Sequence, residues 1–133
     1  MKKQLTAYVS TLLVLLIGDG IWLGLLMGST YRGWLGPLMR ETPVVGPAVA
    51  FYLLYALGLV VFAVLPALHK ERWGRAAAGG VFLGLLAYGT YDLSNWATLQ
   101  GWPAQLALVD IVWGMLVSGL AGTGGYLVTR RFG

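Results

Sequence analysis

The sequence predicts an all-α integral membrane protein, a bundle of four transmembrane helices whose two termini both lie in the cytoplasm. The 133-residue chain is 58% hydrophobic, has a mean hydropathy of +0.74 and carries only 9 basic and 5 acidic residues. A water-soluble domain normally carries charge at about a quarter of its positions. The apolar residues also fall into four stretches, each long enough to cross a hydrocarbon core of about 30 Å as a helix.

We expect one domain over residues 1–133, with spans at about 4–27, 44–65, 74–97 and 103–129. The first span follows Lys2 and Lys3 as a signal peptide would. It contains Asp19 and lacks a convincing small-residue cleavage site, so we expect it to be retained.

Proline and glycine mark the ends of the later spans. Pro43 and Pro47 open the second span and Pro66 closes it, whereas Gly101-Trp102-Pro103 predicts a tight turn before the fourth. The third span is bounded by the charged residues before it and by this turn.

The basic residues predict the orientation. One side of the predicted bundle carries seven of them: Lys2, Lys3, Lys70, Arg72, Arg75, Arg130 and Arg131. The other side carries only Arg32 and Arg40. Basic residues concentrate in cytoplasmic loops, so both termini are expected inside. These short clusters beside apolar runs indicate membrane topology rather than a nucleic-acid partner. The absence of cysteine excludes disulfides and thiol catalysis.

The predicted outer loop, residues 28–42, is unusually apolar. Its large side chains are Tyr31, Trp34, Leu35, Leu38 and Met39. This composition predicts a short element lying on the membrane surface, either as an aromatic anchor or as a lid.

Three of the five acidic residues, Asp19, Asp92 and Asp110, fall inside predicted spans. At a rise of about 1.5 Å per residue, all three lie roughly 9–12 Å below the outer surface. A buried acid costs about 2.5–3.5 kcal/mol on insertion scales, so three at one depth suggest a shared site. No basic residue occurs in that layer to neutralise them. The acids must therefore be protonated and hydrogen-bonded, bind a cation, or stay hydrated in an outward-facing pocket.

Aromatic residues accompany these acids at helical spacing. The sequence reads Asp19-x-x-Trp22, Asp92-x-x-Asn95-Trp96 and Asp110-x-x-Trp113, and residues three apart share a helix face. The predicted ligand-binding residues are Asp19, Trp22, Tyr52, Tyr55, Tyr88, Tyr91, Asp92, Asn95, Trp96, Asp110 and Trp113. The three aspartates are also the candidate catalytic residues.

Nearly the whole chain resembles the bacterial predicted membrane proteins grouped as domain of unknown function 2177. The most specific match is the block Tyr91-Asp92-Leu93-Ser94-Asn95. It is supported by Gly18-Asp19-Gly20-Ile21-Trp22-Leu23, Tyr31-Arg32, Phe51-Tyr52-Leu53-Leu54-Tyr55, Gly101-Trp102-Pro103 and Asp110-Ile111-Val112-Trp113-Gly114. The resemblance implies a small four-span protein of the bacterial inner membrane, and it brings no established activity.

Four functions remain open from the sequence. Carboxylates framed by Trp and Tyr suit an amphiphilic, cationic or lipid-like ligand from the membrane, with or without acid-assisted isomerisation or hydration. A proton- or cation-coupled small transporter is the second. In the third, Asp19, Asp92, Asn95 and Asp110 hold a divalent cation; no other cofactor is predicted. In the fourth, the acids only cross-link the helices, or the protein is an accessory subunit. The stripe Gly20, Gly24 and Gly28 suits close helix packing, within the bundle or in a homodimer.

Overall fold

The computed structural model describes residues 1–39 and 44–133, and its regular elements are all helices. In chain order they are α1 (Lys2–Ile21), the π-helical η1 (Trp22–Leu26), α2 (Gly28–Leu35), the 3-10 helix η2 (Gly36–Leu38), α3 (Val45–Leu59), the π-helical η3 (Val60–Val64), α4 (Leu65–Lys70), α5 (Trp73–Thr98) and α6 (Ala104–Phe132). Arg40 and Pro43 lie outside the described residues. Arg40 was expected in the outer loop, and Pro43 was expected to open the second span.

Within the described part of the chain, three continuous helical stretches are long and apolar enough to cross a membrane. They are Lys2–Leu26, Val45–Lys70 and Ala104–Phe132, close to three of the four predicted spans. The remaining predicted span, the third at 74–97, corresponds to α5, which has the length at 26 residues but not the hydropathy. Glycines, tyrosines and Asp92 interrupt its apolar residues, so the count of four spans stays a prediction.

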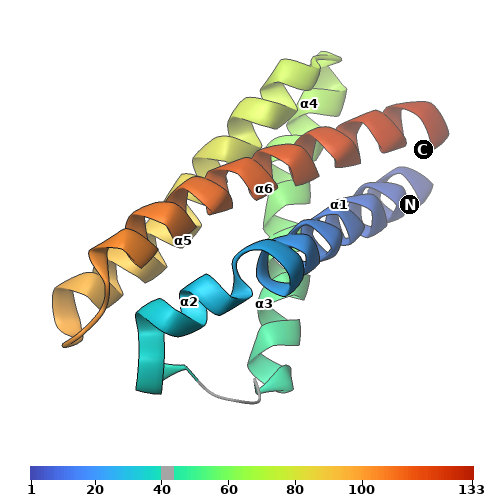
Figure 1. Ribbon diagram of the computed structural model, residues 1–133. Coiled ribbons are helices and arrows are strands. Elements are labelled where there is room, and N and C mark those ends of the chain that lie inside the picture. Colours follow the sequence, from blue (N-terminus) through green and yellow to red (C-terminus); the bar gives the residue numbers. More distant parts are fainter. Residues whose placement is uncertain (40–43) are drawn as a thin grey trace.

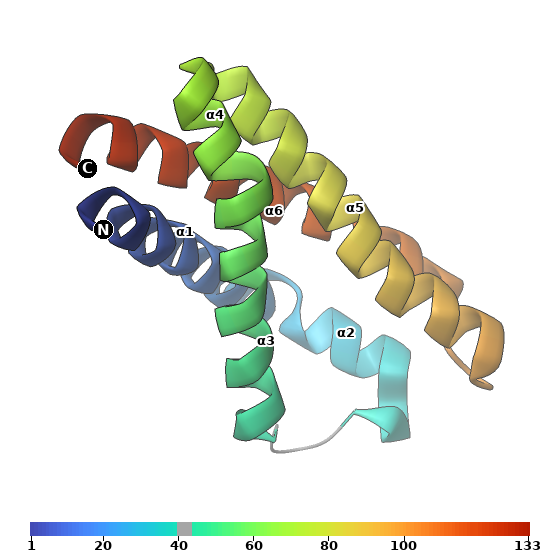
Figure 2. The ribbon, with the colours of Figure 1, turned by 180° about the vertical axis from the view of Figure 1, so that it is seen from behind.

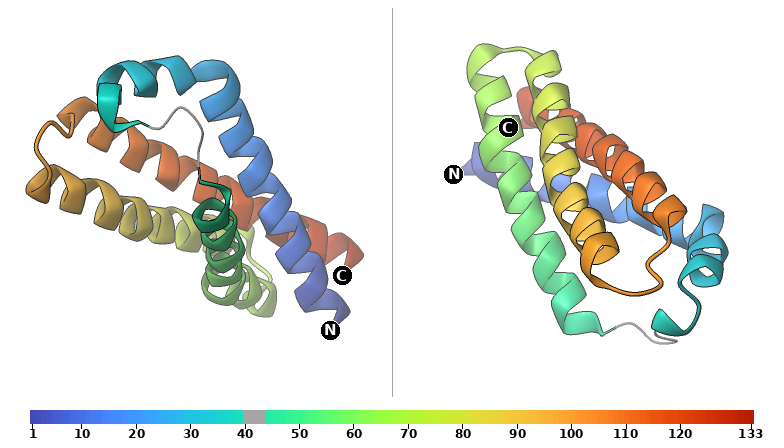
Figure 3. Two further views of the ribbon diagram at one scale, coloured as in Figure 1. Left: turned by 90° about the horizontal axis from the view of Figure 1, so that it is seen from below. Right: turned by 90° about the vertical axis from the view of Figure 1, so that its left-hand side faces the viewer.

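Both termini lie near the junction of α4 and α5, at one end of the molecule (Figures 1 and 3). The helix α2 and the turn between α5 and α6 lie at the opposite end. We call these the terminal end and the α2 end. The helix α3 runs across α1 and α6 rather than parallel to them, and at the α2 end it stands apart from α5 (Figure 2). Its continuation η3 contacts α5 and α6.

The closest packing joins α5 to α6 along most of their lengths. A Cβ added at Gly80 or Gly84 would collide with the backbone of Ser118 or Gly114 on α6. These two glycines therefore allow the backbones of α5 and α6 to lie closer together than larger residues would permit. Consequently α6 is buried along a continuous face, whereas α5 carries its exposed residues on the side away from α6.

The apolar core lies nearer the terminal end. One cluster includes Ala7, Val64 and Tyr126, and a second, closer to the middle, includes Leu15 and Val117. Towards the α2 end the buried residues include two acids, Asp19 and Asp92, which are 7% and 0% exposed. These buried carboxyl groups mark where the candidate site begins.

Candidate functional site

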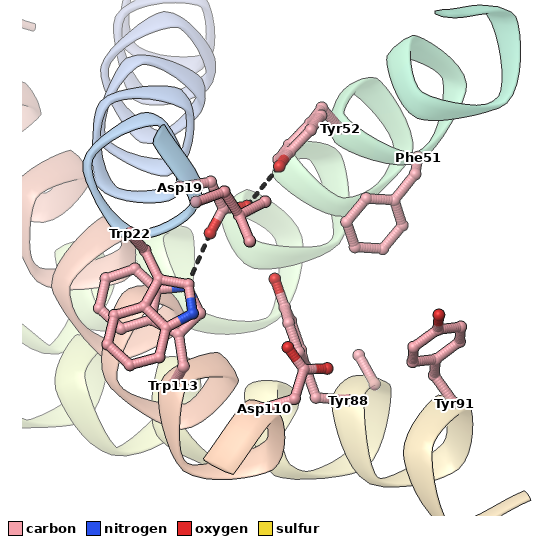
Figure 4. A pocket seen from close by; sticks show the side chains of 10 residues that line it. Asp19, Trp22, Phe51, Tyr52, Tyr88, Tyr91, Asp110 and Trp113 are labelled. Atoms are coloured by element: carbon pink, nitrogen blue, oxygen red, sulfur yellow. Dashed lines mark hydrogen bonds between the residues drawn. The ribbon is translucent and has the colours of Figure 1, made fainter. Parts of the chain in front are cut away.

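A cavity of about 390 Å³ lies towards the α2 end, between α1, α3, α5 and α6 (Figure 4). Its walls are Asp19, Trp22, Leu23, Phe51, Tyr52, Ala87, Tyr88, Tyr91, Asp110 and Trp113. Seven of these ten are residues that the sequence predicted for the site. The acids of α1 and α6 therefore line one cavity, together with six aromatic side chains.

Asp19 is held from two sides. The indole N–H of Trp113 on α6 donates to its Oδ1 at 2.8 Å, and the hydroxyl of Tyr52 on α3 donates to its Oδ2 (Figure 4). Both carboxylate oxygens thus have a donor, each from a different helix. This carboxylate joins α1, α3 and α6 and has little capacity left for another ligand.

Trp22 and Trp113 stack face to face, with ring centroids 4.4 Å apart and planes 3° from parallel. Each indole N–H belongs to the hydrogen-bond network of the acid on the other helix. Trp113 donates to Asp19, whereas the N–H of Trp22 donates to the hydroxyl of Tyr31 at 3.0 Å. The sequence placed each Trp beside the acid on its own helix, and the spacing could not reveal this exchange.

Tyr31 on α2 is 6% exposed, and its hydroxyl donates to Asp110 Oδ1 at 3.1 Å. Burial, reinforced by the charge of Asp110, raises the pKa of this phenol, so it remains a donor. The sequence treated Tyr31 only as part of a surface element. The structure brings it into the polar network, since α2 folds back from η1 over the start of α6.

Asp110 accepts a hydrogen bond from the Tyr31 hydroxyl at Oδ1, and the carboxyl of Asp92 is its other close polar neighbour. The hydrogen bonds that it receives from described residues reach only Oδ1, and the half-buried side chain lines the cavity. Oδ2 is therefore the carboxylate oxygen available to a molecule in the cavity.

Asp92 on α5 does not line the cavity. It is fully buried, and neither carboxylate oxygen has a hydrogen-bond partner in the described part of the chain. Its electrostatic neighbour is Asp110. A buried carboxyl without a donor costs free energy, so this group is the least satisfied in the site.

Three other predicted residues also lie outside the cavity wall. Tyr55 is hydrogen-bonded to the Ser118 hydroxyl at 2.5 Å, deeper in the bundle. Trp96 is 43% exposed, and Asn95 is half-buried near the end of α5. Asn95 follows Asp92 at the three-residue spacing of the other motifs and Trp96 is one residue further on, but neither lines the cavity.

Three lining residues escaped the sequence analysis, namely Leu23, Phe51 and Ala87. Apolar residues in a span carry no pattern that separates a cavity wall from a lipid-facing surface. Phe51 and Tyr31 do occur in the sequence blocks shared with the related family, and this was the available signal.

The residues proposed for a divalent cation lie in the same region but do not form a metal-ligand group in the described part of the chain. Among the described residues, no group of three His, Cys, Asp or Glu side chains is placed to hold a metal ion. Asp19 is directed to Trp113 and Tyr52, while Asp92 lies near Asp110.

Comparison with known proteins identifies the family but no characterised relative. No curated protein and no solved structure matches the chain. The family model described as "Predicted membrane protein (DUF2177)" matches residues 4–127, which include most of each of the four long helical stretches and the complete cavity wall. The chain is therefore a member of the DUF2177 family of predicted membrane proteins.

Proposed function

We propose that this protein spans the bacterial inner membrane four times with both termini in the cytoplasm, and that its cavity binds the cationic head of an amphiphilic molecule from the outer leaflet. The observation that carries the proposal is the Oδ2 atom of Asp110, which accepts no hydrogen bond from the described residues, in an aromatic wall. Among the described lining residues there is no basic side chain to neutralise that carboxylate.

The walls of the cavity suit an organic cation. Ammonium groups are attracted to the faces of Trp and Tyr rings, by about 2 kcal/mol or more where water is excluded. The lining contains Trp22, Trp113 and three tyrosines, and a volume of about 390 Å³ falls within the range of small-molecule sites. Attraction to Asp110 and contact with these rings would act on the same head group.

The mouth of the cavity favours entry from the bilayer. Phe51 on α3 and Tyr91 on α5 are 43% and 55% exposed, and both lie across the cavity from Trp22 and Trp113 (Figure 4). With α1, α3, α5 and α6 as the four spans, this opening between α3 and α5 faces lipid. An apolar tail can then remain in the membrane while the head enters.

The two lining acids have different roles in this proposal. Asp110 contacts the ligand, since one of its oxygens is available. Asp19 is a structural cross-link, because Trp113 and Tyr52 occupy both of its oxygens. The acids would therefore respond differently to the same substitution.

A binding titration tests the proposal. Purified protein in detergent is titrated with an alkyltrimethylammonium probe, and the fluorescence of the lining tryptophans reports binding. Asp110→Asn should weaken binding at least about tenfold without lowering thermal stability, because it removes the charge but keeps the Oδ1 acceptor for the Tyr31 hydroxyl. Asp19→Asn should lower thermal stability.

An alkyl maltoside of equal chain length is the control for nonspecific detergent binding. The proposal is wrong if the maltoside binds as tightly as the cation, or if Asp110→Asn binds the cation as the unmodified protein does. Mass spectrometry of molecules retained during purification then identifies the natural ligand class.

A further inference from the structure

A second depression lies on the lipid-facing side of α5, away from the aspartate cavity. It is a groove of about 620 Å³ between η3 and α5, lined by Phe62, Arg75, Ala78, Gly79, Phe82, Leu83 and Leu86. Phe62 and Phe82 are 60% and 59% exposed. The groove is apolar along its length and has one charged group, Arg75, at its end.

The position of Arg75 follows from a proline. Pro66 has no N–H to donate to the carbonyl of Phe62, four residues earlier, and the helix widens into the π-helical η3 over this turn. The guanidinium of Arg75 donates to the Phe62 carbonyl at 3.3 Å instead. This contact fixes the arginine over the groove while using one of its five N–H donors.

Gly79 provides the space for this arrangement. A Cβ at that position would come within 2.5 Å of Arg75 Nη1 and 3.1 Å of the Ala63 Cβ. The remaining donors of Arg75 form a planar fork that matches the geometry of a phosphate group.

Charge at the terminal end favours an anion. Seven basic residues lie there (Lys2, Lys3, Lys70, Arg72, Arg75, Arg130 and Arg131), whereas Glu71 is the acidic residue beside them. Arg75 is the third residue of α5, so it lies close to the helix end, where a lipid headgroup would be. An anionic headgroup would be attracted to this end.

The length of the groove matches an acyl chain. From Arg75 to Leu86 the helix advances eleven residues, or about 16 Å at 1.5 Å per residue. Half of a hydrocarbon core is about 15 Å thick, which is the depth that one leaflet's acyl chain occupies.

We propose that this groove is a binding site for one anionic phospholipid, with its phosphate on the Arg75 guanidinium and one acyl chain along Phe62, Phe82 and Leu86. The site is independent of the aspartate cavity. The phosphate and the net negative headgroup supply the affinity, and the apolar wall supplies the selectivity for a lipid over a free phosphate.

The test compares lipids by native mass spectrometry and by thermal unfolding of the detergent-solubilised protein. Phosphatidylglycerol should remain bound and raise the midpoint of unfolding, whereas phosphatidylcholine of equal chain length and free glycerol phosphate should do so much less. Arg75→Gln keeps an N–H donor for the Phe62 carbonyl but removes the charge. It should weaken retention of phosphatidylglycerol about tenfold.

Arg131→Gln is the matched control, since it removes the same charge from an exposed position outside the groove. Ala78→Trp fills the groove from an exposed position without changing charge, and it should also abolish retention. Equal retention of both lipids, equal losses in Arg75→Gln and Arg131→Gln, or undiminished retention in Ala78→Trp would each overturn the proposal. Binding of glycerol phosphate as tight as that of the lipid would show a free-phosphate site instead.

Discussion

The two Asp-x-x-Trp motifs exchange their tryptophans between antiparallel helices. Within each motif the Trp shares a face with its own acid, but that face is directed at the neighbouring helix. Trp113 consequently donates to Asp19, and Trp22 reaches Asp110 through the Tyr31 hydroxyl. The stacked indoles lie between the two halves of this network. The polar layer therefore ties α1 to α6 in addition to forming a cavity wall.

Removing one indole N–H tests this exchange. Trp113→Phe keeps an aromatic ring but leaves Asp19 Oδ1 without its donor, so the free energy of unfolding should fall by about 1–3 kcal/mol. Thermal or denaturant unfolding in detergent measures the loss. Trp96→Phe, at an exposed position outside the network, is the control and should change stability by less than about 0.5 kcal/mol. Equal losses in the two variants would show that ring size, and not the hydrogen bond, matters.

Asp92 should respond in the opposite direction. Its carboxyl is completely buried with neither oxygen paired in the described part of the chain, and Asp110 is its electrostatic neighbour. Asp92→Asn replaces the buried carboxyl by a neutral amide that can donate to Asp110. We expect the free energy of unfolding to rise by about 1–2 kcal/mol, measured by the same unfolding assay. A loss of stability would show that the Asp92 carboxyl is a structural partner that an amide does not replace.

Residue spacing grouped four residues that line one cavity, but it also included Asp92, Asn95 and Trp96, which do not line it, and it could not assign the hydrogen bonds. Asp19, Trp22, Asp110 and Trp113 were all expected at the site, and all line the cavity. A period of three or four residues reports the face of one helix, whereas bonding also depends on the rotation and height of its neighbours. Tyr31 shows the same limit, because its contact with Asp110 joins positions 79 residues apart.

At the scale of elements, α2 is more than a surface segment. The apolar composition of residues 28–42 predicted either an anchor or a lid. The helix Gly28–Leu35 buries Tyr31, which also stacks against Trp34 with ring centroids 6.0 Å apart. One hydroxyl thus connects α2 to the carboxylate that we assign to the ligand. A displacement of α2 would therefore change the environment of the Asp110 carboxylate.

Tyr31→Phe should loosen α2 without unfolding the bundle. The variant keeps the ring and its packing but loses the donation to Asp110 and the acceptor for Trp22. Loss of about 1 kcal/mol of local stability should make amide hydrogen exchange in residues 28–35 about fivefold faster. Exchange in 111–126, on α6, is the internal control and should not change. Unchanged exchange in α2 would mean that apolar packing alone holds it.

The π-helical segment η3 also belongs to this scale, and its cause is only partly visible in the sequence. Pro66 predicted the end of a helix, yet the chain continues through η3 into α4, because a wider turn accommodates the missing N–H. Arg75 then takes the Phe62 carbonyl from another helix. A proline pattern indicates where a backbone donor is missing, but tertiary contacts decide whether the helix ends or widens.

For the whole molecule, the topology depends on whether α5 crosses the membrane. The other three long helical stretches have the length and the hydropathy to do so. Its apolar character is reduced by five glycines and by Asp92. Two of those glycines, Gly80 and Gly84, are required for contact with α6, and Asp92 is fully buried. Residues facing a partner helix need not be apolar enough for lipid. Mean hydropathy therefore underestimates the ability of a helix to cross a membrane when a partner helix covers one of its sides. The composition of α5 is consistent with such a span.

The topology can be measured directly because the chain contains no cysteine, so each introduced cysteine is a unique reporter. With four spans and both termini inside, Ser29→Cys and Gln100→Cys should react with a membrane-impermeant maleimide in spheroplasts, whose inner membrane is intact. Glu71→Cys and Gly133→Cys should react only after permeabilisation. All four positions are at exposed ends or turns, so a failure to label reports sidedness rather than burial. If α5 does not cross the membrane, Glu71→Cys and Gln100→Cys will label from the same side. That result would move the cavity mouth away from the bilayer and remove the lateral route for an amphiphile.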